Sequence, residues 1–262
     1  MPRLRVGTVE LGYDDVGDGE AVVFISGTSL DRTVWGPQVT AFADRYRCIT
    51  IDNRDIGESS QMTSGYTPRD LAGDVDGLLA ALDLPAAHVV GHSLGGAIAQ
   101  ELALASPDRV RTLNLIGSWA RNDEYTRVLF RTWKRLRTVL EPAAFVEAIL
   151  LTGVGHTFLN SIGADAMVQL FLAAPNPQTA EGYCRQVDAD LAHDTLDRLG
   201  KIQAPTLVIA GEEDKIFPPH HARQLADGIG AELQMLPGVG HSPAIENAAA
   251  VNAALEKFFT SH

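Results

Sequence analysis

The 262-residue sequence has no long hydrophobic run and only two cysteines. No apolar stretch approaches the roughly 18 residues that a membrane-spanning helix requires. The first twelve residues carry two arginines but no apolar segment or small-residue cleavage site, so no secretory signal is predicted. Nothing else indicates an oxidising compartment, and Cys48 and Cys184 are therefore predicted to be reduced thiols. We expect a cytoplasmic protein with no membrane partner.

Basic residues are also scarce. The chain has 21 lysines and arginines against 33 aspartates and glutamates, which gives a net charge of −12. Proteins that bind nucleic acid usually present a basic patch, so nucleic acid is not an expected partner. A small-molecule substrate is expected instead, and the sequence carries no signal of an oligomeric state.

Segments with strand character alternate with helical segments along most of the chain. Residues 21–25 form a continuous apolar run, which is typical of a strand buried on both faces. The predicted strands are 4–11, 21–25, 46–51, 87–90, 110–116, 206–210 and 232–236. The predicted helices are 32–43, 67–84, 94–105, 219–229 and 244–259. Such alternation predicts an α/β fold with a mostly parallel sheet and helices on both of its faces.

The alternation stops between about Ser118 and Gly200. This stretch lacks convincing strands but holds helical segments at 124–140, 142–151, 164–173 and 177–192, together with many of the aromatic residues. We interpret 119–199 as a helical cap inserted into a core formed by 1–118 and 200–262. Its aromatic residues suggest an apolar pocket, although aromatic residues in packed helices belong more often to the core.

One motif points to nucleophilic catalysis. Gly91-His92-Ser93-Leu94-Gly95 has the pattern Gly-x-Ser-x-Gly, which is weak evidence by itself. It lies, however, between a predicted strand and a predicted helix, where a serine can occupy a sharp, strained turn. Side chains at either glycine would collide with the neighbouring strand and helix. Ser93 is therefore the predicted nucleophile.

A serine hydroxyl needs a general base, and the base needs a carboxylate that orients it. His241 follows the predicted strand 232–236 in a glycine-containing loop, and Asp214 follows the strand 206–210. Both lie at the carboxyl ends of strands, where ligands bind in open α/β sheets, and both follow Ser93 along the chain. His241 is the predicted base and Asp214 the predicted acid, with Glu212 and Glu213 as rivals.

Backbone N–H groups can stabilise the negative oxygen that forms during acyl transfer. The loop 26–29 follows a buried strand, and Leu94 begins the helix after Ser93. We assign the oxyanion hole to the N–H groups of Thr28 and Leu94. The remaining histidines are not expected to take part in catalysis. His92 is expected to point away from the site and pack, and His220 and His221 to be solvated in the first turn of a helix.

The whole chain resembles the α/β-hydrolase superfamily, in particular its small members with a helical cap. The segments that carry this resemblance are Gly91–Gly96, Gly211–Pro219, Gly240-His241 and Asp52–Ser59. The last is similar to the family's Asp-x-Arg-Gly-x-Gly-x-Ser loop, with Asp55 in place of the usual glycine. The family's His-Gly after the third strand is Ser26-Gly27 here.

The resemblance implies an eight-stranded sheet and hydrolysis of a small carboxylic ester or lactone without cofactor or metal. The region from Ser26 to Gln38 looks like that of 3-oxoadipate enol-lactonases, and the Asp52–Ser59 loop is similar to that of anthracycline methyl esterases. A serine at position 93 argues against haloalkane dehalogenases and epoxide hydrolases, which carry an aspartate there.

Other reactions use the same three residues. Hydrolysis of a carbon–carbon bond, or elimination in a synthase, would need polar cap groups at the pocket, for which Arg185 and Gln186 are candidates. A cofactor-free haloperoxidase activity would arise from perhydrolysis of the acyl-enzyme. A protein of another class, which binds a ligand on this fold without turnover, would not react with a fluorophosphonate.

Overall fold

The computed structural model describes residues 2–174 and 176–262, and it contains one eight-stranded sheet with the order β1-β2-β4-β3-β5-β6-β7-β8. The strands are β1 (Arg3–Val6), β2 (Val9–Val16), β3 (Glu20–Ile25), β4 (Tyr46–Ile51), β5 (Ala87–His92), β6 (Val110–Ile116), β7 (Thr206–Gly211) and β8 (Glu232–Leu236). β2 pairs antiparallel with β1 and β4, and the other neighbours pair in parallel. The mostly parallel eight-stranded sheet is confirmed.

The single strand predicted at 4–11 is wrong. Gly7 has a φ of +57°, and the chain reverses there to form a hairpin of β1 and β2. A glycine adopts this left-handed conformation at little cost, whereas the alternating side chains on either side are equally compatible with one strand or two. This hairpin supplies the eighth strand.

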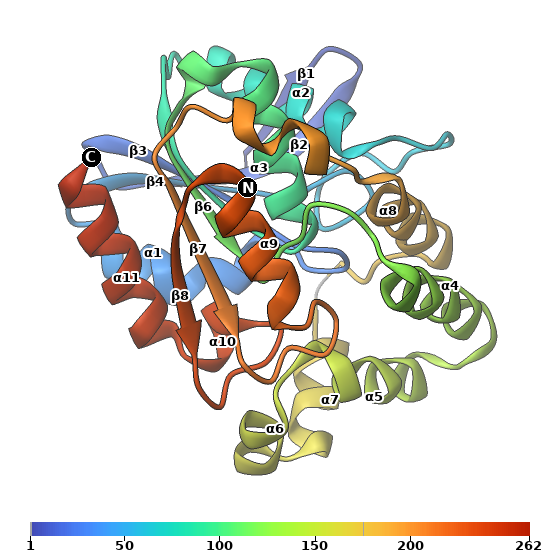
Figure 1. Cartoon of the computed structure of the whole chain (residues 1–262). Coiled ribbons are helices and arrows are strands. Elements are labelled where there is room, and N and C mark those ends of the chain that lie inside the picture. Colours follow the sequence, from blue (N-terminus) through green and yellow to red (C-terminus); the bar gives the residue numbers. More distant parts are fainter. Residues whose placement is uncertain (1, 175) are drawn as a thin grey trace.

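Helices cover both faces of the sheet (Figure 1). On one face lie α1 (Gly36–Phe42), which continues a 3₁₀ turn (Arg32–Trp35), and α11 (Ala248–Ser261), which follows the short α10 (Pro243–Glu246). On the other lie α2 (Pro68–Ala81), α3 (Leu94–Ala105) and α9 (Pro219–Ile229). Thr67 caps α2 in a reciprocal capping box with Asp70. This frame places the carboxyl ends of the parallel strands beneath the cap.

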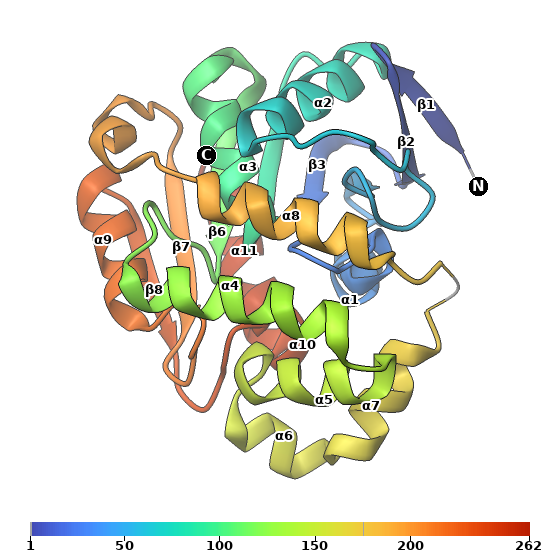
Figure 2. The same cartoon turned by 90° about the vertical axis from the view of Figure 1, so that its right-hand side faces the viewer.

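The chain between β6 and β7 is helical and lies over one end of the sheet (Figure 2). Its helices are α4 (Glu124–Val139), α5 (Pro142–Gly153), α6 (His156–Ile162), α7 (Ala164–Leu172) and α8 (Ala180–Ala192), before a 3₁₀ turn at Leu196–Lys201. α6 was not predicted, because it spans only seven residues between glycine-containing turns. Among the described residues, none of the helices combines the length and apolar character that a bilayer span requires.

A buried ion pair fastens α8 to the core. Nε and Nη2 of Arg185 each donate to a carboxylate oxygen of Asp55 over 2.9 Å, and Asp55 is fully buried. Burial opposes ionisation of Asp55, but the hydrogen bonds from Arg185 and from the N–H of Met62 outweigh it and lower the pKa of the carboxyl group. Asp55 also has a φ of +69°, which a glycine would adopt without strain. The residue that departs from the family pattern is thus one attachment point of the cap.

We expect Arg185→Met to lower the free energy of unfolding by about 2–3 kcal/mol, because it leaves the carboxylate of Asp55 buried without its cation. Adding Asp55→Gly should restore most of this loss. It removes the buried charge, and a glycine adopts the left-handed backbone conformation of this position without strain. Denaturant unfolding of Arg185→Met, Asp55→Gly and the double variant measures the coupling. Arg47→Met is the matched control: Arg47 forms a bidentate pair with Asp15 at the surface, and its loss should cost about 1 kcal/mol or less. An equal loss in Arg185→Met and Arg47→Met would contradict the prediction.

Candidate active site

Ser93 occupies the turn between β5 and α3. Its φ of 53° and ψ of −119° lie in a region that residues other than glycine rarely adopt. Hydrogen bonds hold this conformation: the N–H of Ser93 donates to the carbonyl of Ile116 over 3.0 Å, and its own carbonyl accepts from the N–H of Gly96 and the hydroxyl of Ser118. The backbone strain is thus fixed by neighbouring elements and presents the side chain to the cavity above.

The glycines around Ser93 allow close backbone approach, as predicted. A Cβ at Gly91 would lie 2.3 Å from the carbonyl oxygen of Gly95, and a Cβ at Gly95 would lie 2.0 Å from the carbonyl oxygen of Ile25. Both neighbours are backbone atoms and cannot turn aside. Only glycine at these positions lets β3, β5 and α3 meet beneath Ser93.

His241 and Asp214 meet in the same region. Nδ1 of His241 lies 3.0 Å from Oδ2 of Asp214, and both side chains are buried. The other carboxylate oxygen of Asp214 accepts from the N–H groups of Ile216 and Phe217 over 2.8 and 2.9 Å. The loop after β7 therefore fixes the carboxylate, which in turn orients the imidazole.

The rival acids are committed elsewhere. Glu213 accepts hydrogen bonds from the N–H and the hydroxyl of Thr157 in α6, and it pairs with His156. Glu212 is exposed. Of the three neighbouring carboxylates, Asp214 is the one that contacts His241.

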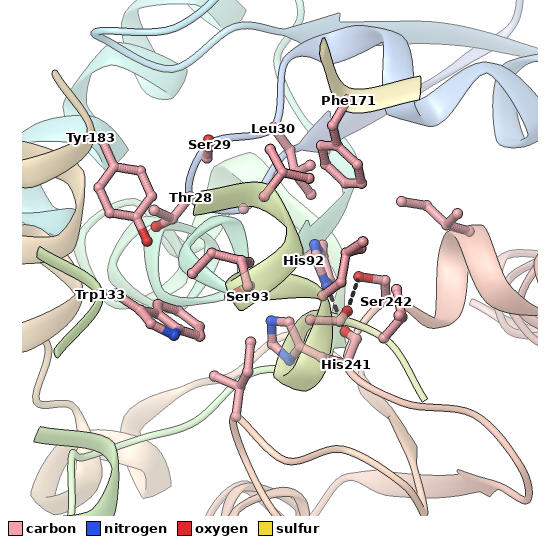
Figure 3. A pocket seen from close by; sticks show the side chains of 18 of the residues that line it. Thr28, Ser29, Leu30, His92, Ser93, Trp133, Phe171, Tyr183, His241 and Ser242 are labelled. Carbon is pink, nitrogen blue, oxygen red and sulfur yellow. Dashed lines mark hydrogen bonds between the residues drawn. The ribbon is translucent and has the colours of Figure 1, made fainter. Parts of the chain in front are cut away.

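The expectation that His92 points away from the site is wrong. His92 lines the cavity, and its Nε2 lies 2.8 Å from the backbone carbonyl of His241 (Figure 3). Burial, with the neighbouring His241, lowers the pKa of His92 to about 3. A neutral imidazole with its proton on Nε2 donates to that carbonyl and so supports the loop of His241.

The loop proposed for the oxyanion hole is held from several sides. The side chain of Asn53 donates to the carbonyl of Ser26 over 2.8 Å, and the indole N–H of Trp35 donates to the Ser26 hydroxyl over 3.0 Å. Thr28 lines the cavity. Leu94 is the first residue of α3, so its N–H is one of the four that lack an intrahelical partner. Serine in place of the family's histidine thus serves as an anchor of this loop.

A cavity lies over Ser93 between the core and the cap, and Figure 3 shows Ser93, His92 and His241 together in it. The core contributes the loop from Gly27 to Leu30. The cap contributes mainly apolar side chains: Phe130, Trp133, Phe145, Met167, Phe171 and Tyr183. Aromatic residues in packed helices belong more often to the core, but several of those in the cap line this cavity. No arginine or lysine is among the described residues that line it.

Arg185 and Gln186, the candidate polar groups of the cap, do not line the cavity. Arg185 binds Asp55, and the side chain of Gln186 accepts from the N–H of Ser29 and donates to the carbonyl of Arg54. The cap does place a carboxyl group at the cavity, that of Asp190, which sequence reasoning missed. A signal was present, because Tyr183, Gln186 and Asp190 share one face of α8 at a spacing of three and four residues.

A second cluster lies outside the cavity. Nε2 of His220 and Nε2 of His221 lie 3.3 and 3.4 Å from Oδ2 of Asp123, and such a group could hold a metal ion. His221 is buried rather than solvated as expected, and burial, with the neighbouring His220, lowers its pKa. None of the three residues lines the cavity over Ser93.

Comparison with known proteins identifies the family to which this fold belongs. The profile of the alpha/beta hydrolase fold family matches residues 20–248. A Mycobacterium tuberculosis protein named as a non-heme bromoperoxidase, BpoC, is 35% identical over 97% of this chain and 98% of its own. Its crystal structure matches with a TM-score of 0.88 over 96% of each chain, at 34% identity.

Two further similarities involve hydrolases by name. An Azorhizobium caulinodans protein named as a carbamate hydrolase, RutD, is 32% identical over 87% of this chain and 86% of its own. The enol-lactonase of Burkholderia xenovorans LB400 matches with a TM-score of 0.89 and 26% identity over 99% of this chain and 100% of its own. The chain belongs to the α/β-hydrolase fold family and is an enzyme of that family.

Proposed function

We propose that this protein is a serine hydrolase that cleaves a small, uncharged carboxylic ester or lactone. The observation that carries the proposal is the meeting of a strained Ser93 with a carboxylate-oriented His241 in one apolar cavity. The reaction requires no cofactor or metal ion and no nucleic-acid or membrane partner. Both cysteines are free, which is compatible with action in the cytoplasm.

In the proposed mechanism, the Nδ1–H of His241 donates to Asp214, which leaves the lone pair of Nε2 available as a base. His241 takes the proton of Ser93 as the hydroxyl oxygen attacks the carbonyl carbon. The N–H groups of Thr28 and Leu94 donate to the oxyanion. His241 then protonates the leaving oxygen, and a water molecule that it activates releases the acid from Ser93.

The cavity lining supports an uncharged substrate. A carboxylate transferred from water into an apolar site without a cation is strongly disfavoured, and no arginine or lysine lines the described cavity. This favours uncharged esters and lactones over lactones that bear a free carboxylate. We assign the selection of the substrate to the cap, 119–199, which supplies most of the apolar lining.

The names of the relatives point to two variants of the same acyl transfer. A carbamate would be attacked at its carbonyl carbon in the same way as an ester. Hydrogen peroxide in place of water would convert the acyl-enzyme to a peracid, which accounts for peroxidase chemistry as a side reaction. Carbon–carbon hydrolysis has less support, because Arg185 and Gln186 are bound outside the cavity.

A fluorophosphonate probe tests the proposed nucleophile directly. We expect the wild-type protein to be labelled with one probe per chain, on the peptide that contains Ser93, because only an activated serine reacts readily. Labelling should abolish the hydrolysis of p-nitrophenyl butyrate, and His241→Ala should prevent labelling. Mass spectrometry of the intact and digested protein measures both. An unlabelled wild type would favour a ligand-binding protein without turnover, and labelling at another serine would refute the assignment.

A further inference from the structure

The carboxyl group of Asp190 lies in the wall of the cavity and has one oxygen without a partner. Asp190 is only 1% exposed, and its Oδ2 accepts a hydrogen bond of 2.7 Å from the hydroxyl of Thr28. Its Oδ1 has no hydrogen-bond partner among the described residues. Buried polar atoms of this kind are rare in folded proteins, and one beside a substrate cavity is suited to bind a ligand.

The surroundings favour the neutral form of this carboxyl group. Burial raises the pKa of Asp190 to about 7, against the opposing effect of the Thr28 hydroxyl. The titratable groups that interact with it are Tyr183 on α8 and Tyr66 from the loop before α2, and burial raises the pKa of both phenols, so they stay neutral. His92, from the strand beneath, is also neutral. Among the residues that the structure describes, no cation therefore contributes to the ionisation of Asp190.

Two basic residues of α4, which packs against α8, have partners of their own. Lys134 pairs with Asp188, and Arg137 donates to the backbone carbonyl of Gln178. Neither residue is among those that line the cavity. The balance between the two forms of Asp190 is thus set by burial and by Thr28.

The hydrogen bond from Thr28 indicates which oxygen of the neutral carboxyl group carries the proton. Oδ2 receives the hydroxyl hydrogen of Thr28, so the acid proton belongs on Oδ1. A protonated Oδ1 is then an unused hydrogen-bond donor in the wall of the cavity. A carbonyl oxygen of an uncharged ligand is the acceptor that suits it, since an anion would find no cation there.

The position of Thr28 indicates which part of the substrate meets this donor. In Figure 3, Thr28 and Tyr183 lie on one side of Ser93, and His241 lies on the other. Because His241 must protonate the leaving oxygen, the leaving group belongs on its side. The acyl chain then extends toward Thr28 and Asp190.

We propose that Asp190 is a specificity-determining residue, whose neutral carboxyl group donates a hydrogen bond from Oδ1 to a second, uncharged carbonyl oxygen on the acyl chain of the substrate. This inference rests on the proposed ester hydrolysis. The preferred substrates are then oxo-acyl or amide-bearing esters, in which a polar carbonyl is carried into an otherwise apolar cavity. Simple alkyl esters of equal length are cleaved less efficiently.

The test compares p-nitrophenyl 4-oxopentanoate with pentanoate, and 5-oxohexanoate with hexanoate. For the wild type at pH 6, we expect kcat/KM to favour one of the oxo esters by about tenfold. In Asp190→Leu, a substitution of similar shape, this ratio should fall to one or below. In Asp190→Asn, whose amide group also donates, part of the preference should remain.

The pH dependence separates binding from a merely structural role. As the pH rises from 6 to 8.5, Asp190 of the wild type loses its proton and with it the donor, so the preference for the oxo ester should decline. In Asp190→Asn the ratio should stay constant with pH. A ratio that is the same in the wild type and Asp190→Leu, or one that grows with pH in the wild type, would overturn the proposal.

A binding experiment keeps the two proposals apart. Saturation-transfer NMR of Ser93→Ala with methyl 4-oxopentanoate and methyl pentanoate reports recognition without turnover. If the wild type cleaves no ester but Ser93→Ala prefers the oxo ester and Asp190→Leu abolishes that preference, ester hydrolysis fails and the role of Asp190 stands. If esters are cleaved through Ser93 and neither experiment shows a preference, the role of Asp190 fails alone.

Discussion

Ser93→Ala is expected to lower kcat for p-nitrophenyl butyrate by about 10⁵-fold or more, because no acyl-enzyme can form without the hydroxyl. The residual rate should come from the oxyanion donors and from binding alone. The thermal midpoint should stay close to that of the wild type, since the backbone, and not the hydroxyl, makes the hydrogen bonds recorded at Ser93. A spectrophotometric assay at high enzyme concentration measures the residual rate. A variant that retains more than about 1% of the activity would refute the nucleophile.

The pattern across a set of variants distinguishes a catalytic unit from independent contributions. His241→Ala should cost about as much as Ser93→Ala, and the double variant should cost no more than either, because residues that act in one step are not additive. Asp214→Asn should lower kcat by about 10⁴-fold, because an asparagine amide favours the wrong tautomer of His241.

Two controls accompany the set. Glu213→Gln tests the rival acid, which binds Thr157 and lies outside the pair with His241, and it should change kcat by less than about tenfold. Ser161→Ala removes an exposed hydroxyl that bonds within its own helix, and it should leave kcat unchanged. A larger loss of kcat in Glu213→Gln than in Asp214→Asn would show that Glu213, and not Asp214, is the acid that orients His241.

The candidate site was readable from the sequence where short-range rules determine it. Ser93 needed only a strand before it, a helix after it and glycines on either side, and the structure places the turn there. Asp214 and His241 follow from chain order and from the ends of strands. The orientation of His92 does not follow from such rules, because it depends on the carbonyl of His241, which lies 149 residues further along the chain.

Asp190 illustrates what the sequence left out. Its partner Thr28 is 162 residues away, and the contact exists only because the cap lays α8 across the loop after β3. Hydrophobic periodicity predicts that one face of α8 is buried but not which element covers it. The first hairpin was missed for a different reason: alternation fixes which residues face inward, and Gly7 alone marks the reversal. Long-range packing and single backbone conformations are thus the parts that required the structure.

Gly95→Ala is expected to destabilise the fold by about 4 kcal/mol or more, which places it among the most damaging single substitutions. The new Cβ would lie 2.0 Å from the carbonyl oxygen of Ile25 and 2.9 Å from that of Ser26. Both atoms belong to the end of β3 and the loop that leads to Thr28, so relief requires a shift of the central sheet or of α3. For a chain of this size, such a loss lowers the thermal midpoint by roughly 8–16 °C.

The same shift should impair catalysis in any folded fraction, because the loop of Thr28 moves relative to Ser93. We therefore expect kcat for p-nitrophenyl butyrate to fall in soluble Gly95→Ala protein. Gly73→Ala is the matched control: it lies within α2, where the new Cβ has no described neighbour within 4 Å apart from the adjoining residues and backbone of its own helix. It should stabilise the protein by up to about 1 kcal/mol. Thermal unfolding and the ester assay on both variants measure the contrast. Equal thermal midpoints for the two variants would show that β3 and α3 can move apart to accommodate a methyl group. The close approach of Gly95 to Ile25 would then not be what positions Ser93.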